Sequence, residues 1–282
     1  MLSNILKLVK GNPLPPDPPD NAPEFTPVQF VDGIHLKRDD LYCFAGIRGG
    51  KVRSCLAIVS RFQEKTHPIP WGLVTASVRK SPQMQIVARV AHRLGIPARC
   101  HTATGAETDE MLDAVAHGAE IITHRPGYNS VICHHAGIDA ERLGWCHIPF
   151  GMEHYQAVTA NAIQARFLAD EINAGRQPRP KRIIVPLGSG MSACGILCGL
   201  RDSGLADLRV LGVRVGGDPT RRLNQYVAGW GAQMDVVTAP EPYERAVEAS
   251  IGDIVVDPHY EAKCVRYLEP GDLFWIIGIR AM

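Results

Sequence analysis

The chain has 282 residues, of which 45% are hydrophobic, and a formal net charge of +1. It is long enough to bury a sizeable core, in one large domain or two smaller ones. The near-neutral charge gives no reason to expect that the bulk surface binds nucleic acid or another polyanion. The 8 cysteines form no CxxC pair, which is typical of reduced, buried thiols in a cytoplasmic protein. No apolar run approaches the roughly 20 residues of a membrane span.

The predicted elements alternate between strands and helices along the chain. A Pro- and Asp-rich stretch near the N-terminus predicts an irregular arm over residues 1–25. We expect strands at residues 34–37, 72–75, 97–102, 120–123, 182–186 and 209–215, and helices at 52–62, 83–94, 109–117, 153–174 and directly after residue 190. Such alternation predicts an α/β fold with parallel sheets that bind ligands at the carboxyl ends of their strands.

Two short motifs indicate the chemistry. The strand ending at Leu187 runs into Gly188, Ser189, Gly190, Met191 and Ser192, a Gly/Ser loop that opens a helix. Small residues and free helix N–H groups make such a loop suitable for a phosphate, and we call Gly188–Ser192 the phosphate cup. Taken alone, a turn of this kind is a packing feature about as often as it is a ligand-binding site. Together with Lys51, which follows two glycines at the head of another helix, it matches what pyridoxal 5'-phosphate (PLP) requires.

The order of several motifs resembles the tryptophan synthase β-like (fold type II) PLP enzymes. The resemblance covers Thr26 to Gly278 and is nearest to the branch of 1-aminocyclopropane-1-carboxylate deaminase and D-cysteine desulfhydrase. The matching segments are Leu36-Lys37-Arg38-Asp39-Asp40-Leu41, Gly49-Gly50-Lys51-Val52-Arg53, Thr75-Ala76-Ser77, the phosphate cup and Asp257-Pro258-His259-Tyr260-Glu261. The resemblance implies a homodimer whose subunits have two domains, each an open, twisted, mostly parallel sheet flanked by helices, with PLP in the cleft. We expect the large domain at residues 26–50 plus 151–282 and the small domain at 51–150.

The resemblance also implies roles for individual residues. Lys51 would form the Schiff base with PLP and, once displaced by the substrate amine, move protons at Cα; the alternative is an ordinary surface lysine. The phosphate cup would bind the phosphate, and Glu261 would face the pyridine nitrogen and keep the ring protonated. Tyr260 would stack on the ring or act as an acid or base, or be a half-buried strand tyrosine. Arg38-Asp39-Asp40 is interpreted as a structural turn that ties its strand to the lysine loop.

The chain also departs from the family pattern. Ser81-Pro82-Gln83 stands where the family has Ser-Asn-His, so the Asn that binds the phenolic oxygen of the cofactor is absent. Ser81 could still bind the substrate carboxylate or act as a nucleophile or acid. Arg48, Arg79 and Lys80 add positive charge, which is either solvated or binds a phosphate on the substrate. The second interpretation suggests an amino acid attached to a nucleotide, such as aminoacyl-thymidylate in bacteriophage DNA hypermodification.

The sequence therefore predicts a PLP-dependent enzyme that acts at the Cα of an amino-acid substrate, by deprotonation or elimination as in deaminases and lyases. The first alternative is a decarboxylase or isomerase of an amino-acid group on a nucleotide. An alternative of another class is a catalytically inactive scaffold that retains the cofactor. Neither a metal site nor direct binding of nucleic acid is expected, because the histidines near Cys133 and Cys146 are interpreted as ordinary loop residues.

Overall fold

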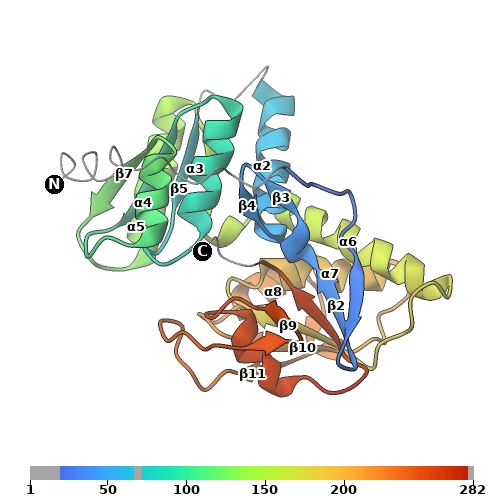
Figure 1. Ribbon diagram of the computed structural model, residues 1–282. Coiled ribbons are helices and arrows are strands. Elements are labelled where there is room, and N and C mark those ends of the chain that lie inside the picture. Colours follow the sequence, from blue (N-terminus) through green and yellow to red (C-terminus); the bar gives the residue numbers. More distant parts are fainter. Residues whose placement is uncertain (1–19, 67–71, 279–282) are drawn as a thin grey trace. The chain divides into compact units, whose positions relative to one another are not determined.

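The computed structural model describes residues 20–66 and 72–278 (Figure 1). Most of the predicted arm, residues 1–19, lies outside the described residues. The chain divides into two compact units. Unit 1 contains Asp20, Cys43–Ile47 and Val59–Phe150, and unit 2 contains Asn21–Tyr42, Arg48–Ile58 and the chain from Gly151 onward. Helix α2 (Gly50–Thr66) begins in unit 2 and ends in unit 1.

Unit 1 is built on a four-stranded parallel sheet in the order β7-β6-β5-β8. Its strands are β5 (Leu73–Ala76), β6 (Ala98–Ala103), β7 (Ala119–His124) and β8 (Cys146–Ile148), and its further helices are α3 (Gln83–Leu94), α4 (Asp109–Ala116) and α5 (Asn129–Leu143). All four residues of β5 are buried, as expected for a central parallel strand covered on both faces.

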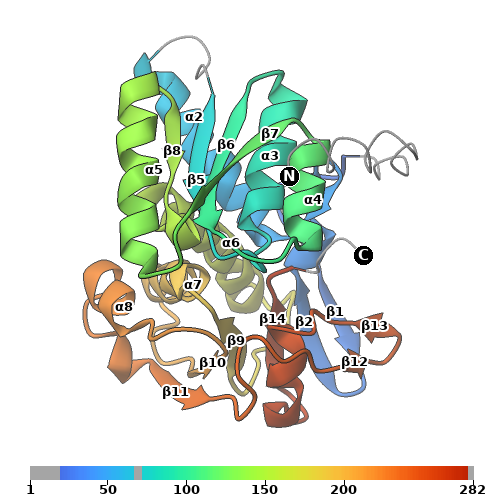
Figure 2. The same cartoon turned by 90° about the vertical axis from the view of Figure 1, so that its left-hand side faces the viewer.

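The two faces of this sheet are covered by different helices (Figure 2). Val74 and Ala76 of β5 pack against Ile132, Ala136 and Ala140 of α5. Thr75 points the other way because side chains alternate along a strand, and its hydroxyl accepts a hydrogen bond from the side chain of Gln83 at the start of α3. The unit is therefore helix, sheet and helix in three layers.

Unit 2 contains a six-stranded sheet in the order β1-β2-β14-β9-β10-β11, in which only the edge strand β1 is antiparallel to its neighbour. The strands are β1 (Val28–Val31), β2 (Ile34–Arg38), β9 (Ile183–Leu187), β10 (Val210–Arg214), β11 (Met234–Thr238) and β14 (Leu273–Ile276). The helices are α6 (Tyr155–Asn173), α7 (Met191–Asp202) and α8 (Thr220–Tyr226).

Alternation along β9 and β14 separates two buried clusters in unit 2. Val185 and Trp275 belong to the cluster that α6 and α7 cover, on one side of the sheet (Figure 2). Ile184 and Phe274 point to the opposite cluster, which contains residues of the 3-10 helix η4 (Glu261–Tyr267). Both faces of the central strands are thus buried, which is why β9 is apolar along its whole length.

Helices α6 and α7 approach each other closely because α7 carries glycine where they cross. A Cβ on Gly195 would lie 2.6 Å from the carbonyl oxygen of Val158, and one on Gly199 would lie 2.4 Å from that of Ala162. Any larger residue would push the helices apart. This contact fixes the start of α7, and with it the loop that precedes the helix.

The short elements complete the description. They are the strand pairs β3 (Cys43–Phe44) with β4 (Ile47–Arg48) and β12 (Ser250–Ile251) with β13 (Ile254–Val255), and the 3-10 helices η1 (Asp39–Leu41), η2 (Phe150–Met152) and η3 (Trp230–Ala232). All eight cysteines lie in the described part of the chain, and none of them forms a disulfide.

The predicted fold class is confirmed: two parallel sheets are flanked by helices. The predicted helix at residues 83–94 coincides with α3. One interpretation was wrong, because the histidines do not lie in loops: His134 and His135 lie on helix α5 and His147 lies on strand β8. The helix gives a weak sequence signal, since its apolar residues Val131 and Ile138 are exposed and Gly137 stands in its middle.

Candidate active site

The loop before Lys51 needs both of its glycines. Gly49 has φ +113°, and a Cβ there would lie 2.8 Å from the carbonyl oxygen of Ile277. That same oxygen accepts the N–H of Gly50 at 2.7 Å, and the N–H of Gly49 donates to the carbonyl of Tyr42 at 2.8 Å. The loop is thereby fixed to the end of β14, and Lys51 is held in the first turn of α2.

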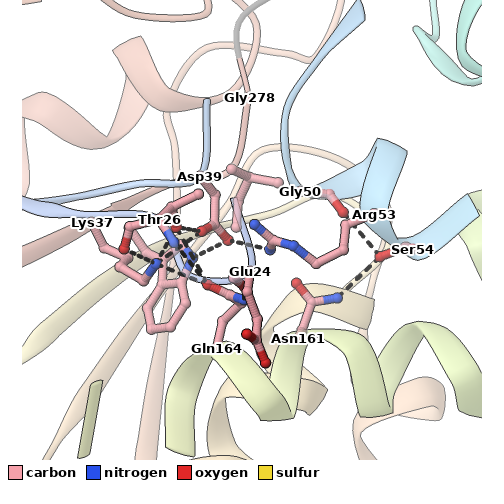
Figure 3. Close-up of polar contacts among 12 residues, drawn as sticks. Glu24, Thr26, Lys37, Asp39, Gly50, Arg53, Ser54, Asn161, Gln164 and Gly278 are labelled. Carbon is pink, nitrogen blue, oxygen red and sulfur yellow. Dashed lines mark hydrogen bonds and ion pairs between the residues drawn. The ribbon is translucent and has the colours of Figure 1, made fainter. Parts of the chain in front are cut away.

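A buried ionic cluster lies beside this loop (Figure 3). Asp39 accepts hydrogen bonds from Lys37 Nζ at 3.2 Å, from Arg53 Nη1 at 3.3 Å and from Trp275 Nε1 at 2.8 Å. Lys37 and Asp39 are completely buried. One carboxylate oxygen of Asp39 would lie 3.2 Å from a Cβ on Gly50, so the cluster packs directly against the lysine loop.

The charges of this cluster balance the cost of burial. Burial by itself would raise the pKa of Asp39, but the neighbouring Lys37 and Arg53, with hydrogen bonds from Thr26 and Trp275, bring that pKa below its ordinary value. Asp39 is therefore ionised and pairs with Lys37 and Arg53 beside the loop, although burial lowers the pKa of Lys37. This agrees with the structural role predicted for Arg38-Asp39-Asp40, in which Arg38 also pairs with Asp40 at 2.7 Å.

The phosphate cup forms the turn between β9 and α7. Gly190 caps α7 with φ +84°, and no side chain caps the helix within the described residues. The first N–H groups of a helix have no partner inside it, so those of Met191 and Ser192 are available to a ligand. The hydroxyl of Ser189 donates to the carbonyl of Gly151 at 3.0 Å and holds the loop.

The ring of Tyr260 connects the cup with the lysine. Lys51 Nζ lies 5.0 Å from the centre of this ring. A Cβ on Gly188 would lie 2.7 Å from Cε1 of the same ring, so Gly188 leaves the space that the tyrosine occupies. The Tyr260 hydroxyl lies 3.1 Å from that of Tyr243, a residue that the motifs did not single out. Lysine, aromatic ring and cup thus meet within unit 2.

Glu261 is 1% exposed and follows Tyr260 directly. Its Oε1 accepts the N–H of Ile277 at 2.9 Å and that of Gly278 at 3.3 Å, which ties it to the segment that also fixes the lysine loop. Burial raises the pKa of Glu261 well above its ordinary value, and the nearby Asp257 carboxyl raises it further. A cationic partner would oppose this rise and favour the carboxylate.

The remaining predicted residues are divided between the two units. Arg48 is exposed in unit 2, whereas Arg79, Lys80 and Ser81 belong to unit 1, and their placement near Lys51 stays a prediction. Arg79 Nη1 donates to the carbonyl of Ala106 at 2.8 Å, so part of its guanidinium supports a loop of its own unit.

Residues around Ser81 also have local roles. The hydroxyl of Ser81 accepts the N–H of Gln83 at 3.3 Å at the start of α3. The side-chain amide of Gln83 donates to Thr75 Oγ1 and to the carbonyl of Pro149, both at 2.8 Å. Gln83 therefore joins the ends of β5 and β8.

The residues of unit 2 fit PLP. A primary amine at Lys51 suits the aldehyde, the Gly-lined cup suits the phosphate ester, and a buried carboxyl at Glu261 suits a pyridinium nitrogen. The glycine at position 188, where a Cβ would collide with Tyr260, leaves the cradle in which these groups meet. In the described residues, no group of three or more His, Cys, Asp or Glu side chains could hold a metal ion. No helix in that part of the chain is long and apolar enough to cross a membrane.

Comparisons with solved structures give the fold. An ACC deaminase homologue is 20% identical with a TM-score of 0.74, over 99% of this chain and 95% of that one. Diaminopropionate ammonia lyase from Escherichia coli is 16% identical with a TM-score of 0.64, over 90% and 82%. The processed form of threonine deaminase isoform 2 from Solanum lycopersicum is 15% identical with a TM-score of 0.61, over 100% of this chain and 88% of that one.

The family is given by a comparison of another kind. No curated protein matches the chain significantly. The family model described as pyridoxal-phosphate dependent enzyme, however, matches residues 23–258, which include Lys51 and the phosphate cup. The chain therefore belongs to the pyridoxal-phosphate dependent enzyme family, and its cofactor is pyridoxal 5'-phosphate.

Proposed function

We propose that the protein uses PLP to act at the Cα of an amino-acid substrate, by deprotonation or elimination as in deaminases and lyases. The observation that carries this proposal is the position of the Tyr260 ring, which contacts both Lys51 and the phosphate cup at Gly188. The family membership and the deaminase and lyase folds to which the chain is similar support the same reaction class.

Each residue then has a defined task. PLP, when bound, withdraws electrons from the Cα of a substrate amine. The amine of Lys51 holds the cofactor and, when released from it, moves the proton at Cα. The N–H groups of the phosphate cup would hold the phosphate, and the Tyr260 ring lies 5.0 Å from Lys51 Nζ.

Glu261 is the residue that would hold the ring nitrogen of PLP. Its carboxyl has a raised pKa because it is buried next to Asp257. A ring nitrogen that carries a proton would place a positive charge against this carboxyl and favour its ionised form. The two charges would stabilise each other, which would strengthen the electron withdrawal on which proton removal at Cα depends.

Two alternatives make different demands on the same site. A substrate attached to a nucleotide needs cations that bind its phosphate. The candidate cations are Arg48 and Lys80, whose side chains are exposed, and Arg79, which also donates to the carbonyl of Ala106. An inactive scaffold needs the cofactor but no proton transfer at Cα. The absence of the family's Asn after Ser81 favours the scaffold, whereas the presence of both Lys51 and Glu261 favours an enzyme.

The test is proton exchange at Cα. Wild-type protein loaded with PLP is incubated in D₂O with L- and D-amino acids, and NMR follows the loss of the Cα proton while product assays follow ammonia and keto acids. We expect exchange with at least one free amino acid, and we expect the Lys51→Ala variant to lose it.

The alternatives give other results. Exchange or decarboxylation only with thymidylate-linked amino acids would replace the free-amino-acid proposal by the nucleotide alternative. If neither substrate class exchanges although PLP is bound, the protein is a scaffold and the proposed activity is wrong.

A further inference from the structure

A cation from outside the family motifs lies beside the phosphate cup. Arg222 of α8 has a side chain that is 18% exposed. Its Nε donates to Glu153 Oε2 at 2.8 Å, and its Nη1 lies 3.4 Å from the carbonyl oxygen of Ser189. Its Nη2 would lie 3.9 Å from a Cβ on Gly151. One edge of the guanidinium is thus held by Glu153, and the other edge is directed to the cup.

Glu153 fixes this orientation. It pairs with both Arg221 and Arg222, and its own side chain is 18% exposed. Burial would raise the pKa of Glu153, but hydrogen bonds and charge from the two arginines bring it below the ordinary value, so the carboxylate stays ionised. Two guanidinium groups against one carboxylate leave one positive charge in excess beside the cup.

The two neighbouring arginines differ in where they lie. The side chain of Arg221 is 65% exposed and pairs with Glu153 and with Gln225 on the surface. Arg222 is the one whose guanidinium reaches the cup, where its Nη1 donates to the carbonyl of Ser189 at 3.4 Å. Arg221 therefore serves as a matched control, with the same charge, the same carboxylate partner and the next position in the chain.

A phosphate monoester carries a charge of about −1.5 to −2 at neutral pH, which backbone N–H groups alone do not neutralise. A planar guanidinium binds phosphate oxygens with two parallel hydrogen bonds, and such charge-assisted bonds are stronger than neutral ones. We propose that Arg222 is a phosphate-binding residue of this chain, oriented by Glu153 to complete the cup. The inference rests on the proposed seating of the cofactor phosphate in that cup.

The test compares PLP with pyridoxal, which has the same ring and aldehyde but no phosphate. Apoprotein of the wild type, Arg222→Gln and Arg221→Gln is titrated with each ligand, and circular dichroism verifies folding. We expect Arg222→Gln to raise the Kd of PLP by at least about tenfold, which corresponds to about 1.4 kcal/mol, and to leave the Kd of pyridoxal unchanged. We expect Arg221→Gln to change neither.

If Arg222→Gln fails to fold, Arg222→Lys provides the same comparison, since it keeps a charge but loses the planar fork. The Lys variant should raise the Kd of PLP relative to that of pyridoxal, but by a smaller factor than the Gln variant. An unchanged Kd of PLP in a folded Arg222 variant, or an equal loss for both ligands, overturns the proposal. Equal affinities of the wild type for PLP and pyridoxal overturn it as well, because the phosphate cup would then not bind the phosphate. Failure of the proposed reaction, in contrast, would leave both affinities unchanged.

Discussion

Replacing Gly188 with alanine tests the contact between the phosphate cup and Tyr260. The new Cβ would lie 2.7 Å from Cε1 of the tyrosine ring, whereas carbon atoms pack best at about 3.5–4.0 Å. Gly188 does not have a positive φ, so alanine is compatible with the backbone and the effect is purely steric. The ring has to move, which also disturbs its hydroxyl contact with Tyr243 at 3.1 Å.

The magnitude follows from these two costs. Overpacking of a buried site costs about 1–3 kcal/mol, and loss of the hydroxyl pair contributes about 0.5–1.5 kcal/mol of that range. Each kcal/mol lowers the Tm by about 2–4 °C for a domain of this size. Since the displaced ring also leaves its place 5.0 Å from Lys51 Nζ, we expect the Kd of PLP to rise by at least about tenfold.

The assay combines thermal unfolding of the apoprotein with PLP titration. Gly217→Ala is the control, because a Cβ there meets nothing within 4 Å. In a Tyr260→Leu background the Gly188→Ala change should cost much less, since the two effects are not additive when the residues touch. A Gly188→Ala variant with the stability and PLP affinity of the Gly217→Ala control would refute the reasoning.

Three further predictions concern the same site. In the wild-type apoprotein, the raised pKa of Glu261 stabilises the fold at pH values below the ordinary pKa of 4.5, and this stability is lost as the pH rises through the folded pKa. The Glu261→Gln variant should therefore gain stability relative to wild type in denaturant titrations carried out at increasing pH from about 4.5. A difference in stability that stays constant with pH would contradict this. Gly49→Ala should prevent attachment of PLP at Lys51, because the Cβ would lie 2.8 Å from the Ile277 carbonyl, and retention of the bound-cofactor absorbance would disprove it. If the nucleotide alternative holds, replacing Arg79 and Lys80 with Gln should leave the affinity for PLP unchanged and raise the Kd of thymidylate-linked amino acids by at least about tenfold. Equal Kd values of the variant and the wild type for these substrates would exclude the two cations from substrate binding.

The sequence indicates the fold where periodicity is strong. Helix α3 has apolar residues on one side and ends at Gly95 in the left-handed conformation, so its bounds are predicted correctly. Helix α5 lacks this signal, because exposed Val131 and Ile138 stand where a buried stripe would be expected. Its burial depends on small residues such as Ala136 and Ala140 packing on β5, which requires knowledge of the sheet.

The same distinction holds for the site. Lys51 and the phosphate cup are local motifs, in which glycines and a helix start are adjacent in the chain, and they are visible in the sequence. Arg222 is not, since only the tertiary fold brings α8 to the loop at Ser189. Tyr243 is missed for the same reason: it lies in no motif, and its contact with Tyr260 depends on the turn around Asp257.

The central claim is that Lys51 holds the cofactor beside Tyr260 and the cup. Reduction of the PLP-loaded wild-type protein with borohydride, followed by peptide mapping with mass spectrometry, tests it most directly. The account predicts a single pyridoxyl group on the peptide that contains Lys51, and none in Lys51→Ala. A pyridoxyl group on another lysine, or none after reconstitution with PLP, would contradict it.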